Sequence, residues 1–161
     1  MQEELSKSAR RVQDALEKME LGCRVRELPS SARSAQDAAS AIGCHISQIV
    51  KSLIFRTQET REGVLVFVSG ARQVDEELLE GYVGARIVKA DAAFVREVTG
   101  FAIGGVPPVA HKMALPHIYI DEDLTLMDEV WAAAGTPHGV FCVSGQDLLR
   151  ATRGRVVRLS R

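Results

Sequence analysis

The chain of 161 residues lacks the features that mark several large classes of protein. No apolar run approaches the ~20 residues that a membrane-spanning helix needs, and the chain opens with an amphipathic pattern in place of a signal sequence. Neither Gly-x-Gly-x-x-Gly nor Gly-Lys-Ser/Thr occurs, so the sequence does not support a dinucleotide or triphosphate loop. We therefore expect a cytoplasmic protein that does not enter a membrane.

Potential metal ligands and disulfide partners are also scarce. Cys23, Cys44 and Cys142 are odd in number and contain no Cys-x-x-Cys pair, so neither a disulfide framework nor a structural zinc site is indicated. His111 and His117 have no third ligand at a recognisable spacing. We expect no metal and no cofactor.

Positively and negatively charged residues are nearly equal in number, with 20 Lys and Arg against 21 Asp and Glu. The formal net charge of -1 argues against a broad cationic face that coats duplex nucleic acid. A hydrophobic content of 46% is sufficient for a sizeable core. Because no linker, internal repeat or change of composition divides the chain, we expect residues 1–161 to form a single domain.

Apolar spacing and the positions of glycine and proline predict short helices that alternate with strands. An amphipathic helix is predicted at about 2–21, before Gly22. Further helices are predicted to begin after residues that can cap them, namely Ser34, Asp75, Asp91 and Ser144. Strands are predicted at 23–28, 49–55, 64–68, 86–88, 118–120, 139–143 and 155–159. This irregular alternation, in which several hairpins are expected, predicts an α+β fold with a mixed sheet.

The stretch 99–112 contains three glycines and two prolines and predicts a rigid loop. Backbone N–H groups exposed in such a loop suit a phosphate, a carboxylate or a developing oxyanion. The alternative is a tight connection between a helix and a strand. The loop follows the C-terminus of a predicted helix, unlike the usual phosphate site at a helix N-terminus.

Lys51 is the one charged residue in the apolar run 49–55. If this run is a strand, Lys51 shares a face with Leu53 and Phe55. Its ammonium group then either reaches solvent at the end of the strand or points into a pocket beside apolar side chains. The strand pattern alone leaves both interpretations open.

Several blocks of the sequence, taken together and in order, resemble the YbaK family of free-standing aminoacyl-tRNA deacylases, which is related to the editing domain inserted in bacterial prolyl-tRNA synthetases. The likeness extends from about Ser31 to the C-terminus. It implies a strongly curved mixed β-sheet surrounded by short helices. The blocks are 49–55, Thr99-Gly100-Phe101, 104–108, Leu115-Pro116 and Ile120-Asp121.

The resemblance implies hydrolysis of the ester between tRNA, with tRNA for proline expected, and a small mischarged amino acid such as alanine, cysteine, serine or threonine. Loop amides would stabilise the oxyanion, and the ribose hydroxyl of the substrate would help to activate water. The implied catalytic residues are Lys51, Gly104 and Gly105. The implied substrate-binding residues are Lys51, Ser52, Phe101, Gly104, Gly105, Val106, Pro108 and His138, although His138 also suits a surface turn.

The expected partners are the acceptor end of aminoacyl-tRNA and prolyl-tRNA synthetase, and the sequence does not indicate an oligomeric state. Arg150 and Arg153 lie three residues apart on a predicted helix and are expected to contact tRNA phosphates. Two positions depart from the family pattern, since members of the family often have serine where Pro107 stands and glycine where Ala110 stands. The alternative function is a catalytically silent module that binds tRNA or a synthetase through the same pocket.

Overall fold

The structure is a computed structural model, and it describes residues 5–161. The elements in chain order are α1 (Lys7–Lys18), β1 (Arg26–Glu27), α2 (Ala35–Ile42), the 3-10 helix η1 (Ile46–Gln48), β2 (Val50–Thr57), β3 (Gly63–Ser69), α3 (Glu76–Val83), β4 (Ile87–Lys89), α4 (Ala92–Thr99), β5 (His117–Asp121), α5 (Glu122–Thr125), β6 (Val130–Ala133), β7 (Gly139–Val143), α6 (Gly145–Thr152) and β8 (Arg155–Val157). The predicted helix at about 2–21 corresponds to α1, and residues 2–4 lie outside the described residues. No helix in the described range is long and apolar enough to cross a membrane.

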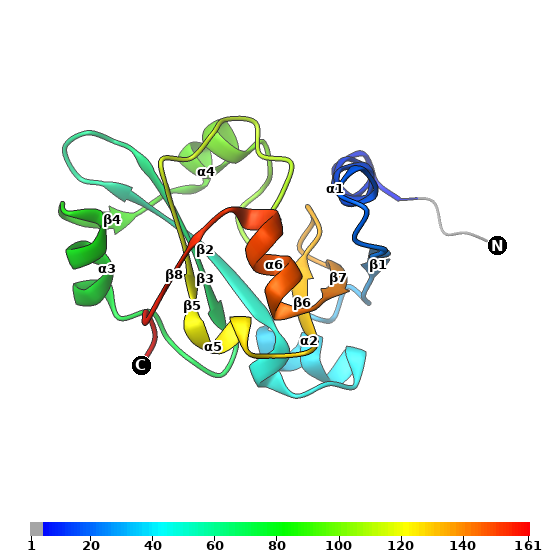
Figure 1. Cartoon of the computed structure of the whole chain (residues 1–161). Coiled ribbons are helices and arrows are strands. Elements are labelled where there is room, and N and C mark those ends of the chain that lie inside the picture. Colours follow the sequence, from blue (N-terminus) through cyan, green and yellow to red (C-terminus); the bar gives the residue numbers. More distant parts are fainter. Residues whose placement is uncertain (1–4) are drawn as a thin grey trace.

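The strands of the described residues form two sheets (Figure 1). The larger sheet has the order β4-β2-β3-β5-β8, in which β2 is antiparallel to β3 and β4, while β5 is parallel to β3 and β8. The smaller sheet, β1-β7-β6, is antiparallel. The predicted mixed α+β fold is confirmed. The single strongly curved sheet is not observed, because the strands divide between two open sheets.

The predicted hairpin of the strands at 49–55 and 64–68 is formed by β2 and β3, with Lys51 opposite Val68 and Phe55 opposite Val64. Every residue of β3 is buried, as expected for a strand at the centre of a sheet that is covered on both faces. Leu65 and Phe67 belong to the larger apolar cluster of the core. Their neighbours Val64, Val66 and Val68 belong to the cluster on the other face.

Local capping explains where the helices begin. Ser34 accepts a hydrogen bond from the Asp37 amide at 3.0 Å, and the Asp37 carboxylate accepts one from the Ser34 amide at 3.3 Å, which completes a capping box. Asp75 and Asp91 cap α3 and α4 through their carboxylates. Each of these side chains satisfies an N–H group that has no partner within its helix.

Helix α1 packs into the core through one apolar face. Its Ala9, Val12 and Leu16 side chains are fully buried. The Gln13 amide group donates to the Cys23 carbonyl at 3.0 Å and accepts from the Val25 N–H at 2.8 Å. These bonds hold the segment after α1 against the helix, beside the β6–β7 hairpin (Figure 1).

The edge of β2 is paired along only part of its length. Strand β4 pairs with β2 only at Phe55–Thr57, so within the described residues no strand of the larger sheet borders 50–54 on that side. Strand β6 approaches there through a single parallel bridge between Ile49 and Trp131. The two sheets thus leave a gap at the N-terminal half of β2.

Candidate functional site

A cavity of about 230 Å³ occupies this gap between β2 and the β6–β7 hairpin. It brings together Lys51, Ser52 and Gly104, three of the residues implied by the sequence resemblance. Most of the remaining lining is apolar. The full lining is Leu28, Ala32, Arg33, Ser34, Ala35, Ala38, Ile49, Val50, Lys51, Ser52, Leu53, Gly104, Trp131, Ala133, Pro137, Gly139 and Val140.

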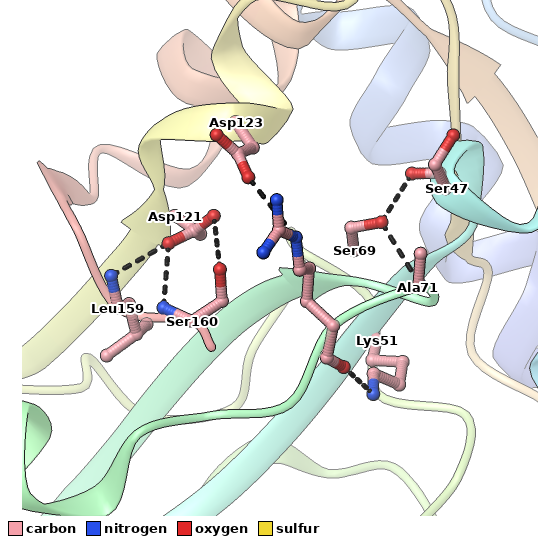
Figure 2. Close-up of polar contacts among 9 residues, drawn as sticks. Ser47, Lys51, Ser69, Ala71, Asp121, Asp123, Leu159 and Ser160 are labelled. Atoms are coloured by element: carbon pink, nitrogen blue, oxygen red, sulfur yellow. Dashed lines mark hydrogen bonds and ion pairs between the residues drawn. The ribbon is translucent and has the colours of Figure 1, made fainter.

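Lys51 is held by a backbone carbonyl group. Its Nζ donates to the carbonyl oxygen of Arg72, and the Arg72 side chain in turn lies 3.7 Å from the Asp123 carboxylate (Figure 2). Burial lowers the pKa of Lys51 from its ordinary value. An ammonium group has three N–H donors, so the bond to Arg72 leaves two for other acceptors.

Ser52 carries a buried hydroxyl oxygen with no hydrogen-bond partner among residues 5–161. Its backbone faces the gap as well. The Ile54 carbonyl accepts from the Ala90 N–H at 3.2 Å on the β4 side, and strand alternation directs the Ser52 N–H and C=O to that same side, where β6 approaches and the cavity lies. A buried polar side chain without a partner is rare in a folded protein, and the Ser52 hydroxyl belongs to a residue that borders a cavity able to admit a polar ligand.

The two glycines of the loop differ in their surroundings. The Gly105 N–H donates to the Ala102 carbonyl at 3.1 Å and closes a turn in which Gly104 has a φ of +89°. The Gly105 carbonyl accepts from the Gly135 N–H at 2.9 Å, and a Cβ at Gly105 would lie 2.6 Å from the Thr136 carbonyl carbon. The Gly105 N–H is therefore already engaged within the loop. By contrast, the Gly104 N–H has no acceptor within the described range.

Three other loop residues lie away from the cavity lining. Phe101 and Val106 are 1% and 2% exposed and belong to the larger core cluster. Pro108 is buried and borders a different groove. Their buried side chains anchor the loop to the protein interior and do not line the cavity.

His138 lies beside the cavity lining, between Pro137 and Gly139, which are both part of it. Its Nδ1–H donates to the Ala32 carbonyl at 3.2 Å, and its own carbonyl accepts from the Leu28 N–H at 2.8 Å. Because Ala32 and Leu28 both line the cavity, His138 fixes its wall.

The prolines and Ala110 shape the second half of the loop. Ala110 has a φ of +68°, a conformation that favours glycine. The His111 Nε2–H donates to the Pro107 carbonyl at 2.6 Å, and the Lys112 N–H donates to the Thr99 carbonyl at 3.0 Å. Burial lowers the pKa of His111, which favours the neutral ring that makes this bond.

A second, larger groove of about 660 Å³ lies beyond the loop. Arg153 and Arg155 line it together with His111 and His117. The spacing predicted Arg153 on the same face of a helix as Arg150, and this prediction is wrong. Helix α6 ends at Thr152, and Arg153 follows it with a φ of +55°. Arg150 lies outside this groove and pairs with the Asp147 carboxylate.

The cysteines do not form an activated nucleophile. Burial raises the pKa of the Cys23, Cys44 and Cys142 thiols, which favours the protonated form over the reactive thiolate. Across residues 5–161, no group of three or more His, Cys, Asp or Glu side chains is arranged to hold a metal ion.

Trp131 is the main lining residue that sequence analysis missed. It is the only tryptophan of the chain, and it stands in β6, a strand that was not predicted. The alternation of buried and half-buried residues in Val130–Ala133 is the signal that marks it, although it spans only four residues.

The chain resembles known proteins in sequence and in fold. The model of the aminoacyl-tRNA editing domain matches residues 29–151. YwhH of Bacillus subtilis (strain 168), an uncharacterized protein, is 30% identical over 126 residues, which cover 77% of this chain and 78% of YwhH. Proline–tRNA ligase of Desulforamulus reducens is 33% identical over 104 residues, which cover 64% of this chain and 17% of the ligase.

A solved structure agrees with these matches. The crystal structure of a protein provisionally described as a trans-editing enzyme for prolyl tRNA synthetase is 46% identical, with a TM-score of 0.91 over 98% of this chain and 99% of that chain. The predicted relationship to editing proteins and to prolyl-tRNA synthetase is thereby confirmed. Because the model of the editing domain matches residues 29–151, which are most of the sequence, the chain belongs to the aminoacyl-tRNA editing domain family.

Proposed function

We propose that this chain is a trans-editing deacylase that hydrolyses the ester between a small mischarged amino acid and the 3′ end of a tRNA, with tRNA for proline as the carrier. One observation carries the proposal. Lys51, the unpartnered hydroxyl of Ser52 and the turn at Gly104 border the same cavity. Together they offer polar donors around a mainly apolar space, as expected for a site that binds a small acyl group.

In the proposed reaction, water adds to the ester carbonyl, the bond to the ribose oxygen breaks, and free amino acid and tRNA are released. The Gly104 N–H, which has no acceptor in the described part of the chain, is the donor best suited to the oxyanion. Lys51 contributes positive charge, and its two remaining N–H groups can bind the ester carbonyl or the terminal phosphate. The cavity lining contains no Ser-His-Asp or Cys-His arrangement, in keeping with a water molecule activated by the substrate's ribose hydroxyl.

The cavity favours small acyl groups. A volume of about 230 Å³, shared between the acyl group and the adjoining ribose, leaves little room for a long side chain. Four small side chains with no rotatable bonds form part of its lining, namely those of Ala32, Ala35, Ala38 and Ala133. Because one methylene changes binding by only about 1–3 kcal/mol, we expect graded discrimination among alanine, cysteine, serine and threonine.

For the tRNA itself, we propose phosphate contacts from Arg153 and Arg155 in the larger groove, with Arg150 contributing less because its charge is balanced by Asp147. Replacement of Arg153 and Arg155 by glutamine should raise the KM for aminoacyl-tRNA and reduce the dependence of KM on salt. Arg150→Gln is the matched comparison and should change both quantities less. Equal effects in all variants would contradict this assignment.

The function is tested by deacylation of tRNA for proline charged in turn with alanine, cysteine, serine, threonine and proline. We expect release of at least one of the small amino acids well above the uncatalysed rate, and slower release of proline. The bond between Lys51 and the Arg72 carbonyl favours the silent binding module as the second candidate, because it gives Nζ a structural role within the protein. Tight tRNA binding without release of any of the five amino acids would support that module and reject the deacylase.

A further inference from the structure

Helix α1 precedes the region that matches the editing-domain model, yet it contacts the loop of the candidate site. The Arg11 Nη2 donates to the Gly100 carbonyl at 2.8 Å. The guanidinium carbon of Arg11 lies 4.3 Å from the centroid of the Phe101 ring. Neighbouring Arg10 makes no such contact and instead pairs with Asp14 on the outer face of the helix at 3.2 Å.

Both Arg11 contacts are made where the loop begins. Gly100 is the C-cap of α4, so its carbonyl lies at the negative end of that helix and attracts a cation. The planar guanidinium group also stacks on the face of an aromatic ring. Phe101 is 1% exposed, although Arg11, which covers it, is itself on the surface. Arg11 thus fixes both the path of the backbone and the first side chain of the loop.

A continuous series of contacts joins Phe101 to the turn at the cavity. A Cβ placed on Gly135 would lie 3.1 Å from Phe101 Cε1 and 2.9 Å from the Ser8 carbonyl oxygen, so Gly135 is enclosed between the ring and α1. The Gly135 N–H donates to the Gly105 carbonyl at 2.9 Å. These contacts form a packed route from the Phe101 ring to the turn that contains Gly104.

We propose that Arg11 is a positioning residue for deacylation, which it serves by holding the loop so that the Gly104 N–H faces the reacting carbonyl. This inference rests on the proposed function. Arg11 acts through Gly100 and Phe101 and does not touch the substrate. Loss of such positioning should affect the transition state more than the bound substrate, because the oxyanion forms only during the reaction.

The test compares Arg11→Ala, Arg11→Lys and the control Arg10→Ala in deacylation and in amide hydrogen exchange. Arg11→Ala should lower kcat by roughly tenfold with little change in KM, which is the pattern of an interaction made in the transition state. Arg11→Lys keeps the positive charge and N–H donors for the Gly100 carbonyl but loses the planar group that stacks on Phe101, and it should recover part of that loss. Arg10→Ala should match the wild type. Circular dichroism and thermal unfolding verify that each variant is folded.

Hydrogen exchange gives a readout that does not depend on activity. The Gly105, Lys112 and Gly135 amides, each bonded within or to the loop, should exchange faster in Arg11→Ala than in Arg10→Ala. Unchanged exchange, or a rise in KM at constant kcat, would overturn the positioning role. If the wild-type chain deacylates nothing, the proposed function fails, whereas the exchange rates still decide whether Arg11 holds the loop.

Discussion

Substitution of the two adjacent loop glycines by alanine should separate the structural role of Gly105 from the conformational role of Gly104. At Gly105 the added Cβ would lie 2.6, 2.8 and 2.9 Å from three backbone atoms of Thr136, which cannot rotate away. Such overpacking costs about 1–3 kcal/mol. The displacement would also weaken the Gly135–Gly105 hydrogen bond, which contributes about 1 kcal/mol. We therefore expect Gly105→Ala to lose about 2–4 kcal/mol of unfolding free energy.

Gly104 has open space where an added Cβ would lie, with nothing within 4 Å, but its φ is +89°. The left-handed conformation alone costs alanine roughly 1–2 kcal/mol. In a chain of 161 residues, 1 kcal/mol lowers Tm by about 2–4 °C. The assay is thermal unfolding of both variants by circular dichroism at one protein concentration. A Tm of Gly105→Ala equal to or above that of Gly104→Ala would refute the close packing against Thr136.

Three further predictions concern stability. Asp121→Ala should lower the free energy of unfolding by about 2–5 kcal/mol in denaturant titrations, because the buried carboxylate accepts from the Leu159 and Ser160 amides and the Ser160 hydroxyl (Figure 2). Asp121→Asn should lower it less. Equal losses in the two variants would contradict this account. Ala110→Gly should raise the unfolding free energy by about 0.5–1 kcal/mol by relieving a positive φ, and a decrease would argue against that strain. His111 has a pKa below its ordinary 6.5 in the folded state, so the folded chain binds this proton less tightly than the unfolded chain, and unfolding free energy should fall as pH falls below about 6.5. His111→Gln should flatten that decline in a pH series of denaturant titrations, and an unchanged slope would refute it.

The sequence predicted the parts of the fold that depend on neighbouring residues. A helix cap needs a polar side chain and an N–H group two or three positions later, so Ser34, Asp75 and Asp91 marked helix starts correctly. The β2–β3 hairpin was predicted for a similar reason, since its strands are long, apolar and separated by a short polar turn.

Features that depend on distant contacts were not predicted. Strand β6 is short, and its place is set by pairing with β7 and by the approach of Trp131 to Ile49. Division of the strands into two sheets likewise follows from packing between remote segments. Arg153 was placed on a helix because its spacing from Arg150 is helical, but the helix ends one residue before it.

The candidate site was likewise predicted only in part from the sequence. The resemblance of ordered blocks selected Lys51, Ser52 and Gly104, which border one cavity. Residue type and spacing could not show that a side chain fits at Gly104 but not at Gly105, because that difference arises from Thr136, a residue more than thirty positions away along the chain. The local turn then decides which N–H stays available among the described residues, since the Gly105 N–H donates to the Ala102 carbonyl and the Gly104 N–H does not.

The central claim, that the cavity at Lys51 hydrolyses aminoacyl-tRNA, is tested most directly by single-turnover deacylation of alanyl-tRNA for proline with Lys51→Met and the control Lys89→Met. Lys89 is an exposed lysine of the same sheet, so both variants lose one charge from a strand. We expect Lys51→Met to remain folded and to lose at least tenfold in rate, equivalent to about 1.4 kcal/mol, while Lys89→Met matches the wild type. Equal rates for the wild type and both variants would contradict the assignment of the site.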